Sequence, residues 1–242
     1  FCHELEVVQG GFMRVAMGAA SAVAIEWMGH STFQITSSKG TRILTDPHGA
    51  FDLPHPTLPQ HIVTTSHQHG PHNSVHMAPG TPVILHGLTP TGEDWQKIST
   101  TIRDVSVYAV PAYHDKSQGM QRGKNAIFVF RVDDICIAHL GDLSHKLTEE
   151  QVKAFGKVDI AMIPIGGTFT MPPDTAREVL QQLKPKIAVP MHYRESTYLL
   201  DMFVKGYPHK YLNTHMTTFS KMALPPPTQI VVFTPWQMWD YR

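Results

Sequence analysis

The densest chemical signal in this sequence is a histidine-rich segment over residues 67–72 (HQHGPH). It directly follows an apolar, β-branched run over residues 61–66, so a rigid strand would fix where the histidines begin. Neutral imidazole is the commonest protein ligand for zinc and its neighbours, and imidazoles this close together predict a metal site. One loop cannot complete a coordination sphere, and three further candidate ligands stand elsewhere in the chain: His114, Asp142 and His192.

The composition excludes several classes of partner. The 242-residue chain has 20 Lys plus Arg and 20 Asp plus Glu, so no field of one sign would steer nucleic acid or a membrane surface toward it. No run of 18 or more apolar residues is present to span a membrane. The 16 histidines of this otherwise neutral chain fit metal chemistry better. We therefore expect a small-molecule substrate as the partner, and a homo-oligomer stays open.

The two cysteines are expected to take no part in the chemistry. Cys136 lies in an apolar segment typical of a buried strand and is interpreted as a buried free thiol, while Cys2 lies near the first residue. We expect neither a disulfide framework nor a cysteine-based zinc site. Any metal must be held by imidazole and carboxylate, which accept Zn²⁺, Mn²⁺, Fe²⁺ or Ni²⁺. Zn²⁺ is the expected cofactor, as one or two ions.

Residues 1–23 are expected to form an N-terminal extension, and residues 24–242 a single domain. Residues 12–24 are rich in small and apolar side chains and end in ASAVA, which resembles the end of a secretory leader. This pattern favours a periplasmic or secreted location over a cytoplasmic one. Whether a leader was removed upstream stays open.

Apolar runs separated by turn residues predict an α/β protein with two β-rich halves. Strands are expected at residues 24–27, 32–35, 41–44, 61–65, 82–85, 105–110, 126–132, 135–138, 159–164, 187–189 and 229–233. The pair Asp133 and Asp134 predicts a hairpin turn. Helices are expected at residues 148–155, 174–183 and 197–204. The first two are expected to begin at the capping residues Thr148 and Asp174.

Every candidate ligand lies just after a predicted strand, and loops at one edge of a sheet are where functional sites collect. The candidates at these strand ends are His67, His69, His72, His114, Asp142 and His192. Gly141 would permit a tight backbone approach beside Asp142, and Pro190 would stiffen the loop that holds His192. We therefore expect the six side chains to converge.

In these segments the chain resembles the metallo-β-lactamase superfamily of metal-dependent hydrolases. The resemblance rests on residues 27–33 (WMGHSTF), 45–47 (TDP), 67–73 (HQHGPHN), 113–115 (YHD), 122–126 (RGKNA), 139–142 (HLGD), 164–167 (PIGG) and 190–193 (PMHY). Within the superfamily it is similar to the ascorbate-6-phosphate lactonase-like branch. The resemblance implies a four-layer αββα sandwich.

The resemblance also implies a set of metal ligands, with one departure. The family's first loop reads His-x-His-x-Asp-His, and Pro71 occupies the position of the Asp. The implied first site consists of His67, His69, His114 and Asp142, and the second of His72, His192 and the same Asp142. Three ligands and an open position are a workable zinc geometry, but one negative charge fewer predicts weaker binding of a second ion.

The implied chemistry is hydrolysis by a water molecule whose pKa a bound metal lowers toward about 7. Because the Asp of the first loop is missing, Asp142 or a neighbouring histidine would have to accept the proton. His145 and His30 are the candidate histidines. Asp46 either supports a ligand histidine from behind or simply forms a turn.

Arg122, Lys124 and Asn125 are the candidate substrate anchors, because cationic groups beside a metal suit a phosphate or carboxylate. The alternative for these residues is a solvated loop. Two functions stay open: a metal-dependent hydrolase of a small-molecule ester, lactone, amide or phosphodiester, and a degenerate relative that binds a metal or ligand with little or no catalysis. Retention of Asp142 favours the hydrolase, and Pro71 favours the degenerate relative.

Overall fold

The computed structural model describes residues 2, 21–49, 52–194 and 196–236. Its first sheet is mixed, and its strand order is β13 (Met216–Ser220), β1 (Ala22–Trp27), β2 (Phe33–Thr36), β3 (Arg42–Thr45), β4 (Ile62–Thr65) and β5 (Val83–His86). Buried and half-exposed residues alternate along β1 and β2, as expected for strands with one face on a core. Parallel pairing begins at β3 and continues to β5.

The second sheet is longer and also mixed. Its strand order is β12 (His209–Tyr211), β14 (Gln229–Val232), β11 (Ile187–Met191), β10 (Ile160–Pro164), β9 (Ile135–His139), β8 (Lys124–Val132), β7 (Val105–Tyr113) and β6 (Ser99–Ile102). β9, β10 and β11 run parallel and are buried along their whole length. Continuous apolar runs of this kind are typical of parallel strands covered on both faces.

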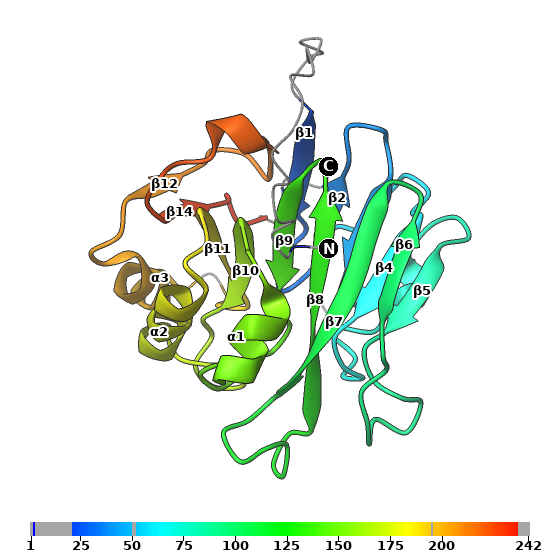
Figure 1. Ribbon diagram of the computed structural model, residues 1–242, viewed down its shortest axis with the longest axis horizontal. Coiled ribbons are helices and arrows are strands. Elements are labelled where there is room, and N and C mark those ends of the chain that lie inside the picture. Colours follow the sequence, from blue (N-terminus) through cyan, green and yellow to red (C-terminus); the bar gives the residue numbers. More distant parts are fainter. Residues whose placement is uncertain (1, 3–20, 50–51, 195, 237–242) are drawn as a thin grey trace, which may run out of the picture.

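The core lies between the two sheets (Figure 1). Apolar side chains of the first sheet, such as Ile25 and Phe33, belong to the same buried cluster as Phe128 and Phe130 of the second. Burying each such side chain contributes about 1.5–3 kcal/mol. This packing fixes the two sheets against each other, so the loops at their ends are held in register.

Three α-helices lie next to β9, β10 and β11 (Figure 1). They are α1 (Glu149–Phe155), α2 (Pro173–Leu183) and α3 (Thr197–Val204). α1 begins with a capping box, in which Thr148 and Gln151 satisfy each other's backbone N–H groups. Between β4 and β5 the chain makes only one turn of 3-10 helix, Val75–Met77.

The predicted α/β sandwich is confirmed, and each predicted strand and helix is present. The predicted helix cap at Asp174 is wrong, because α2 begins at Pro173 and Asp174 lies within its first turn. Asp133 and Asp134 form the predicted hairpin turn, with φ angles of +48° and +61°. Three strands go beyond the prediction, namely β6, β12 and β13. β1 begins at Ala22, two residues before the predicted start of the domain. Of the leader-like residues 12–24, residues 12–20 lie outside the described residues, and residues 22–24 form the start of β1.

The prediction of a buried free thiol at Cys136 is wrong, because Cys136 forms a disulfide with Cys2. The two cysteines are 134 residues apart in the sequence. The carbonyl oxygen of Cys2 also accepts a hydrogen bond of 2.8 Å from the backbone N–H of Lys157. The N-terminal end is therefore attached to β9, the strand that leads toward Asp142.

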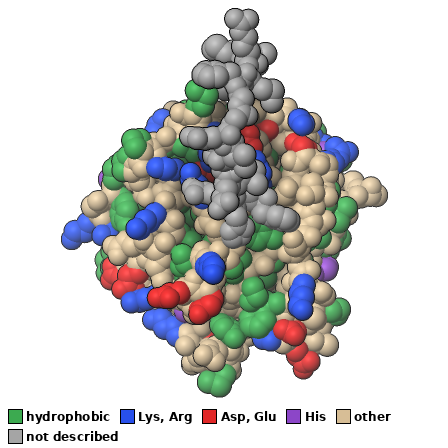
Figure 2. Space-filling view, viewed as in Figure 1, with side chains coloured by type: hydrophobic (Ala, Val, Ile, Leu, Met, Phe, Trp, Pro, Cys, Tyr) green, Lys and Arg blue, Asp and Glu red, His purple; other side chains and the backbone are tan. Residues whose placement is uncertain are grey.

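The surface agrees with the neutral composition. On the face shown in Figure 2, acidic and basic side chains are interspersed, and no large patch of one sign stands out there. Among the described residues, no helix combines the length and apolar character that a membrane span requires.

Candidate metal centre

Asp142 lies at the centre of a cluster of imidazole rings. The Nε2 atoms of four histidines surround its Oδ2 atom, at 3.1 Å for His114, 3.2 Å for His72, 3.4 Å for His192 and 3.7 Å for His67. All five side chains are buried. The ring of His69 lies beside them, with its centroid 4.7 Å from that of His67. The structure thus brings together the six ligands predicted from the sequence.

Loops at the ends of strands from both sheets position these side chains. In the first sheet β4 ends two residues before His67, and in the second β7 ends directly before His114. β9 ends three residues before Asp142, and β11 ends directly before His192. The C-terminal ends of β7 and β9 point to the lower edge of the molecule in Figure 1. The cluster therefore closes one end of the sandwich.

Gly141 allows the backbone to turn Asp142 into this centre. Its φ is +54°, and an added Cβ would lie 2.4 Å from Asn125 Oδ1 and 2.6 Å from Ser66 Cβ, so any side chain here would clash. Asn125 holds the same turn. Its Nδ2 donates to the carbonyl of Leu140 (3.0 Å), and its Oδ1 accepts from the backbone N–H of Asp142 (3.0 Å).

Asp46 supports two of the histidines from behind. Its Oδ2 accepts a hydrogen bond of 3.0 Å from His72 Nδ1. It also accepts the hydroxyl of Ser66 (2.5 Å), whose oxygen lies 2.9 Å from His67 Nδ1. Asp46 has a φ of +40°, a strained value for a residue with a side chain. Of the two roles considered for Asp46, these contacts are those of a group that orients ligand histidines.

The ring nitrogens form two groups of three, each compact enough to hold an ion. In each group the potential ligand atoms lie within 4.8 Å of one another, and the two all-histidine groups among the described residues are His67, His69 and His114, and His30, His72 and His192. A third group, Asp46, His67 and His72, overlaps both. His30 was expected only as a proton acceptor. Its ring centroid lies 4.0 Å from that of His192 and 4.9 Å from that of His72.

Two buried polar atoms at the centre fit a bound cation. His67 Nε2 and Asp142 Oδ1 are buried and have no hydrogen-bond partner among the described residues. Leaving a buried polar atom unsatisfied costs about 1–3 kcal/mol, and a divalent ion would remove that cost. Imidazole and carboxylate are also the donor set of zinc and its neighbours. The residues of the cluster therefore fit a metal.

The electrostatics of the cluster favour positive charge at its centre. Burial lowers the pKa of His72, but the neighbouring carboxylates of Asp142 and Asp46 outweigh burial and raise it to about 10. Burial lowers the pKa of His67 well below its usual value, and the charge of His72 lowers it further. Burial likewise lowers the pKa of His30 to about 2. His67 and His30 are therefore neutral imidazoles at physiological pH, the form that binds metal.

The histidines open into a cavity of about 490 Å³. Pro71, Gln121, Arg122, Phe169 and Arg194 complete its lining. The guanidinium carbon of Arg122 lies 5.5 Å from the ring centroid of Phe169, and that of Arg194 lies 5.9 Å from the same centroid. Two cationic side chains thus share one aromatic ring in the cavity wall, an environment that suits an anionic group.

Asp115 shapes the loop that carries Arg122 to the cavity. Its carboxylate accepts hydrogen bonds from the backbone N–H groups of Ser117 (2.7 Å), Gly119 (3.0 Å), Gln121 (3.0 Å) and Arg122 (2.8 Å). Burial would raise the pKa of Asp115, but these hydrogen bonds to the ionised form outweigh burial and lower it. The β7–β8 loop, at the lower edge of Figure 1, is thus folded around one carboxylate.

Two of the three predicted substrate anchors are not brought to the cavity. Lys124 Nζ bonds to the carbonyl of Glu93 and lies 4.1 Å from the ring centroid of Trp95. Asn125 is fully buried, and its side chain forms hydrogen bonds with the backbone carbonyl of Leu140 and the backbone N–H of Asp142. Arg122 is the predicted anchor that does line the cavity.

The predicted proton acceptor His145 does not line the cavity either. Its Nε2 accepts the backbone N–H of Tyr113 (3.1 Å), and its Nδ1 lies 2.6 Å from the carbonyl of Lys146. Both ring nitrogens are therefore engaged with backbone groups. Conversely, Arg194 and Phe169 line the cavity but were not among the residues predicted from the sequence. The position of Arg194, two residues after the predicted ligand His192 at a strand end, was the available signal.

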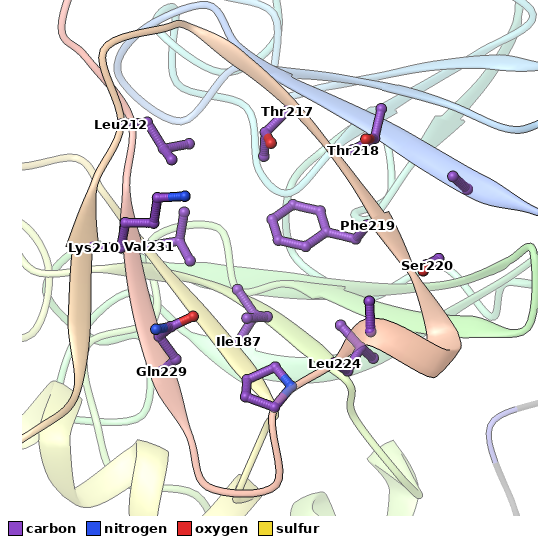
Figure 3. A pocket seen from close by; sticks show the side chains of 13 residues that line it. Ile187, Lys210, Leu212, Thr217, Thr218, Phe219, Ser220, Leu224, Gln229 and Val231 are labelled. Carbon is purple, nitrogen blue, oxygen red and sulfur yellow. The ribbon is translucent and has the colours of Figure 1, made fainter.

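A second cavity, of about 390 Å³, lies among the C-terminal strands (Figure 3). Ile187, Phe219 and Val231 are among the side chains that line it. Lys210 is the one charged side chain among the described residues of its wall, and no histidine or carboxylate is found there. Of these two cavities, the histidine-lined cavity is therefore the one equipped for metal chemistry.

Comparison with known proteins identifies a family. A family model described as a beta-lactamase superfamily domain matches residues 24–192. A UPF0173 metal-dependent hydrolase of Thermococcus onnurineus is 32% identical over 193 residues, which cover 71% of this chain and 84% of that protein. A Thermotoga maritima structure is described as a Zn-dependent hydrolase of the metallo-β-lactamase superfamily. It matches with a TM-score of 0.67 and is 29% identical in sequence, and the match covers 87% of this chain and 98% of that protein. A metallo-β-lactamase fold protein of Bacillus subtilis shares the fold at 9% identity, with a TM-score of 0.61 over 89% of this chain and 98% of its own.

Proposed function

The chain belongs to the metallo-β-lactamase superfamily of metal-dependent hydrolases, and from that premise we propose that it cleaves a small, negatively charged ester, lactone, amide or phosphodiester. The observation that carries the proposal is the convergence of four imidazole Nε2 atoms on Asp142 Oδ2, in a cavity whose wall holds two arginines. The cavity volume of about 490 Å³ suits a small-molecule substrate.

In this proposal His67, His69, His114 and Asp142 would hold the first metal. A second metal would use His72, His192 and the same Asp142. A bound divalent ion supplies Lewis acidity and makes hydroxide available from water near neutral pH. The orphaned His67 Nε2 and Asp142 Oδ1 atoms support this ligand set. Zn²⁺ is the ion that we propose, since imidazole and carboxylate are among its preferred ligands.

Asp142 is proposed to take up the proton released during the reaction, through whichever carboxylate oxygen the ions leave free. Burial raises the pKa of Asp142, but the charges of His72 and His192 outweigh burial and hold it well below its usual value, so the carboxylate is ionised and able to accept a proton. Asn125 and the tight turn at Gly141 fix the direction of the carboxylate, so its proton transfer geometry would be set before substrate arrives. His145 takes no part in this proposal, because backbone groups engage both of its ring nitrogens.

Arg122 and Arg194 are proposed to bind the anionic part of the substrate. Both line the histidine cavity, and both pack against Phe169. A guanidinium matches the geometry of a carboxylate or phosphate through two parallel hydrogen bonds. A substrate anchored there would hold its scissile bond over the histidines, since the same cavity contains both groups.

Pro71 is proposed to weaken the second metal site. It lines the cavity beside His72, where a carboxylate would contribute one more negative charge. Proline has no ligand atom in its side chain, so two dications would share the single charge of Asp142. We therefore expect the first ion to bind tightly and the second with lower affinity. Pro71→Asp should raise the affinity of the second ion, and an unchanged affinity would contradict this account.

The direct test is a substrate panel with metal-loaded protein. The panel contains p-nitrophenyl esters, lactones, amides and phosphodiesters, each with and without an added carboxylate or phosphate. We expect turnover of anionic members, its loss on chelation, and its return on addition of Zn²⁺. His114→Ala should abolish turnover, whereas His209→Gln, an exposed residue of β12, should retain it.

Inertness of the fully metal-loaded protein toward the whole panel would overturn the proposal. It would then favour a relative that binds a metal or ligand without turnover. Turnover that survives complete removal of metal would contradict the proposed role of the histidine cluster.

A further inference from the structure

We propose that His30 is a metal ligand. With His72 and His192 it forms a second three-imidazole site, which shares Asp142 with the site of His67, His69 and His114. The inference rests on the proposed function, because it concerns the second ion of the same centre. It explains how a chain with Pro71 in its first loop keeps enough ligands for two ions.

The positions of the rings support the assignment. The potential ligand atoms of His30, His72 and His192 lie within 4.8 Å of one another. Two nitrogens bound to one tetrahedral zinc at about 2.05 Å are about 3.4 Å apart, so side-chain shifts of about an ångström would complete the site. His72 and His192 already direct their Nε2 atoms at Asp142 Oδ2, at 3.2 Å and 3.4 Å. His30 therefore stands where a further ligand of the second ion is required.

The backbone ties His30 to His192. The N–H of His192 donates a hydrogen bond of 3.1 Å to the carbonyl of His30, and the indole N–H of Trp27 donates to the same oxygen (3.2 Å). Both histidines have left-handed φ angles, +51° for His30 and +56° for His192. Residues other than glycine rarely hold this conformation, and such strain collects at functional sites.

Gly166 makes room for this arrangement. A Cβ at Gly166 would lie 2.1 Å from the carbonyl oxygen of His192 and 2.9 Å from its Nδ1 atom. The close approach of this glycine holds the strained His192 peptide against its neighbour. The β1–β2 turn, which carries His30, and the end of β11 are thus fixed relative to each other before any ion binds.

The chemistry of the two sites becomes alike under this assignment. Each ion would have three imidazole ligands and a share of the Asp142 carboxylate. His30 replaces the ligand that Pro71 cannot supply, but it does not replace the missing negative charge. The second site would therefore be complete in ligand number and still weaker than one with its own carboxylate. Imidazole-rich sites favour Zn²⁺, Co²⁺ or Ni²⁺ over Mg²⁺ or Ca²⁺.

The test is a Co²⁺ titration of the metal-free protein, followed by visible absorption and by calorimetry. Wild-type protein should bind two Co²⁺ ions in two resolved steps. His30→Gln should bind the first normally and weaken the second by at least about 100-fold, because loss of a mere hydrogen-bond partner behind a ligand already weakens binding by about 10–100-fold. His209→Gln is the matched control and should behave as wild type.

A double variant separates ligation from packing. If His30 fills the place of the missing carboxylate, His30→Gln should weaken binding of the second Co²⁺ ion by a much smaller factor in the Pro71→Asp background than in the wild type. A purely structural role for His30 would weaken that ion by the same factor in both backgrounds. Circular dichroism of the metal-free variants checks that each is folded.

A measurement on the wild type needs no variant. In Co²⁺-loaded protein each ligand imidazole shows a paramagnetically shifted, solvent-exchangeable N–H proton by NMR. Six such resonances are expected with His30 as a ligand and five without it. Five resonances, a single bound Co²⁺, or an unaltered second step in His30→Gln would each overturn the assignment and leave the hydrolase proposal standing. Absence of any tight Co²⁺ binding by the wild type would instead overturn both.

Discussion

His72 Nδ1 donates a hydrogen bond of 3.0 Å to Oδ2 of Asp46, and both side chains are buried. This contact leaves His72 Nε2 pointing at Asp142 Oδ2, 3.2 Å away. A carboxylate behind a ligand imidazole fixes the ring and raises its basicity. Asp46→Asn keeps the shape of the side chain but removes that charge. We expect it to weaken metal binding by about 10–100-fold, measured by competition with a chromogenic chelator.

Asp201→Asn is the matched control for Asp46→Asn, because Asp201 is an exposed residue of α3. It should bind metal as the wild type does. Equal affinity of all three proteins would show that the Asp46 contact does not support the metal site.

The carboxylate of Asp115 predicts a pH-dependent stability. Its folded-state pKa is lowered by four backbone N–H groups, although burial opposes this. Ionised Asp115 therefore stabilises the fold above its unfolded pKa of about 3.9, and this contribution is lost as the pH falls through the lower folded value. Asp115→Asn should reduce the free energy of unfolding at pH 7 by about 2 kcal/mol. Urea unfolding at pH 7 and at pH 3 measures the difference, which should shrink at pH 3.

If Asp115→Asn reduced the free energy of unfolding equally at pH 7 and at pH 3, ionised Asp115 would not be the source of the stabilisation. The same variant also loosens the loop that carries Arg122, so we expect a raised KM for anionic substrates.

Arg122 and Arg194 should decide between charged and neutral substrates. Each Arg→Ala variant should lower kcat/KM for an anionic substrate by about 10–100-fold, the loss of one charge-assisted hydrogen bond of about 1.5–3 kcal/mol. For the uncharged analogue the change should be small. Lys124→Ala is the matched control, because Lys124 packs on Trp95 away from the cavity. Equal losses for charged and neutral substrates would argue against an anion-binding role.

The Cys2–Cys136 disulfide should contribute strongly to stability. It closes a loop across 134 residues, and on the chain-entropy account such a loop is worth up to about 5 kcal/mol. We expect Cys2→Ser to lower the melting temperature, and reduced wild-type protein to melt like the variant. Calorimetry with and without a reducing agent measures both. Identical melting of oxidised, reduced and variant proteins would contradict the prediction.

Most of the fold was accessible from the sequence because its central strands carry strong local signals. β9, β10 and β11 are buried along their length, so their apolar runs stand out between turn residues. The three unpredicted strands lack such a signal. Each residue of β12 is exposed, and exposed and half-buried residues alternate in β6. Strands of this kind are defined by pairing with a neighbour rather than by their own composition.

The clustering of the candidate ligands was predictable because they follow strand ends. The roles of residues within a strand were not predictable, because they depend on which face of the sheet each side chain points to. His67, His114, Asp142 and His192 follow strand ends, and the fold brings these ends together. Lys124 and Asn125 lie inside β8, where neighbouring side chains point to opposite faces.

The disulfide pairing and the position of His30 beside the other histidines could be found only in the folded structure. No local pattern links Cys2 to Cys136 across 134 residues. His30 lies between β1 and β2, where the sequence shows one histidine without a companion. Its relation to His192 follows from the packing of the two sheets.

The two sheets contribute proposed ligands to the same centre, His67 from the end of β4 and Asp142 from beyond the end of β9. A bound ion would therefore cross-link the two sheets at this end of the sandwich. Any motion that separates the sheets there would have to lengthen or break the bonds between the ion and its ligands. Loss of metal would in turn free that rim to move, so slowed hydrogen exchange at these strand ends would report occupancy directly.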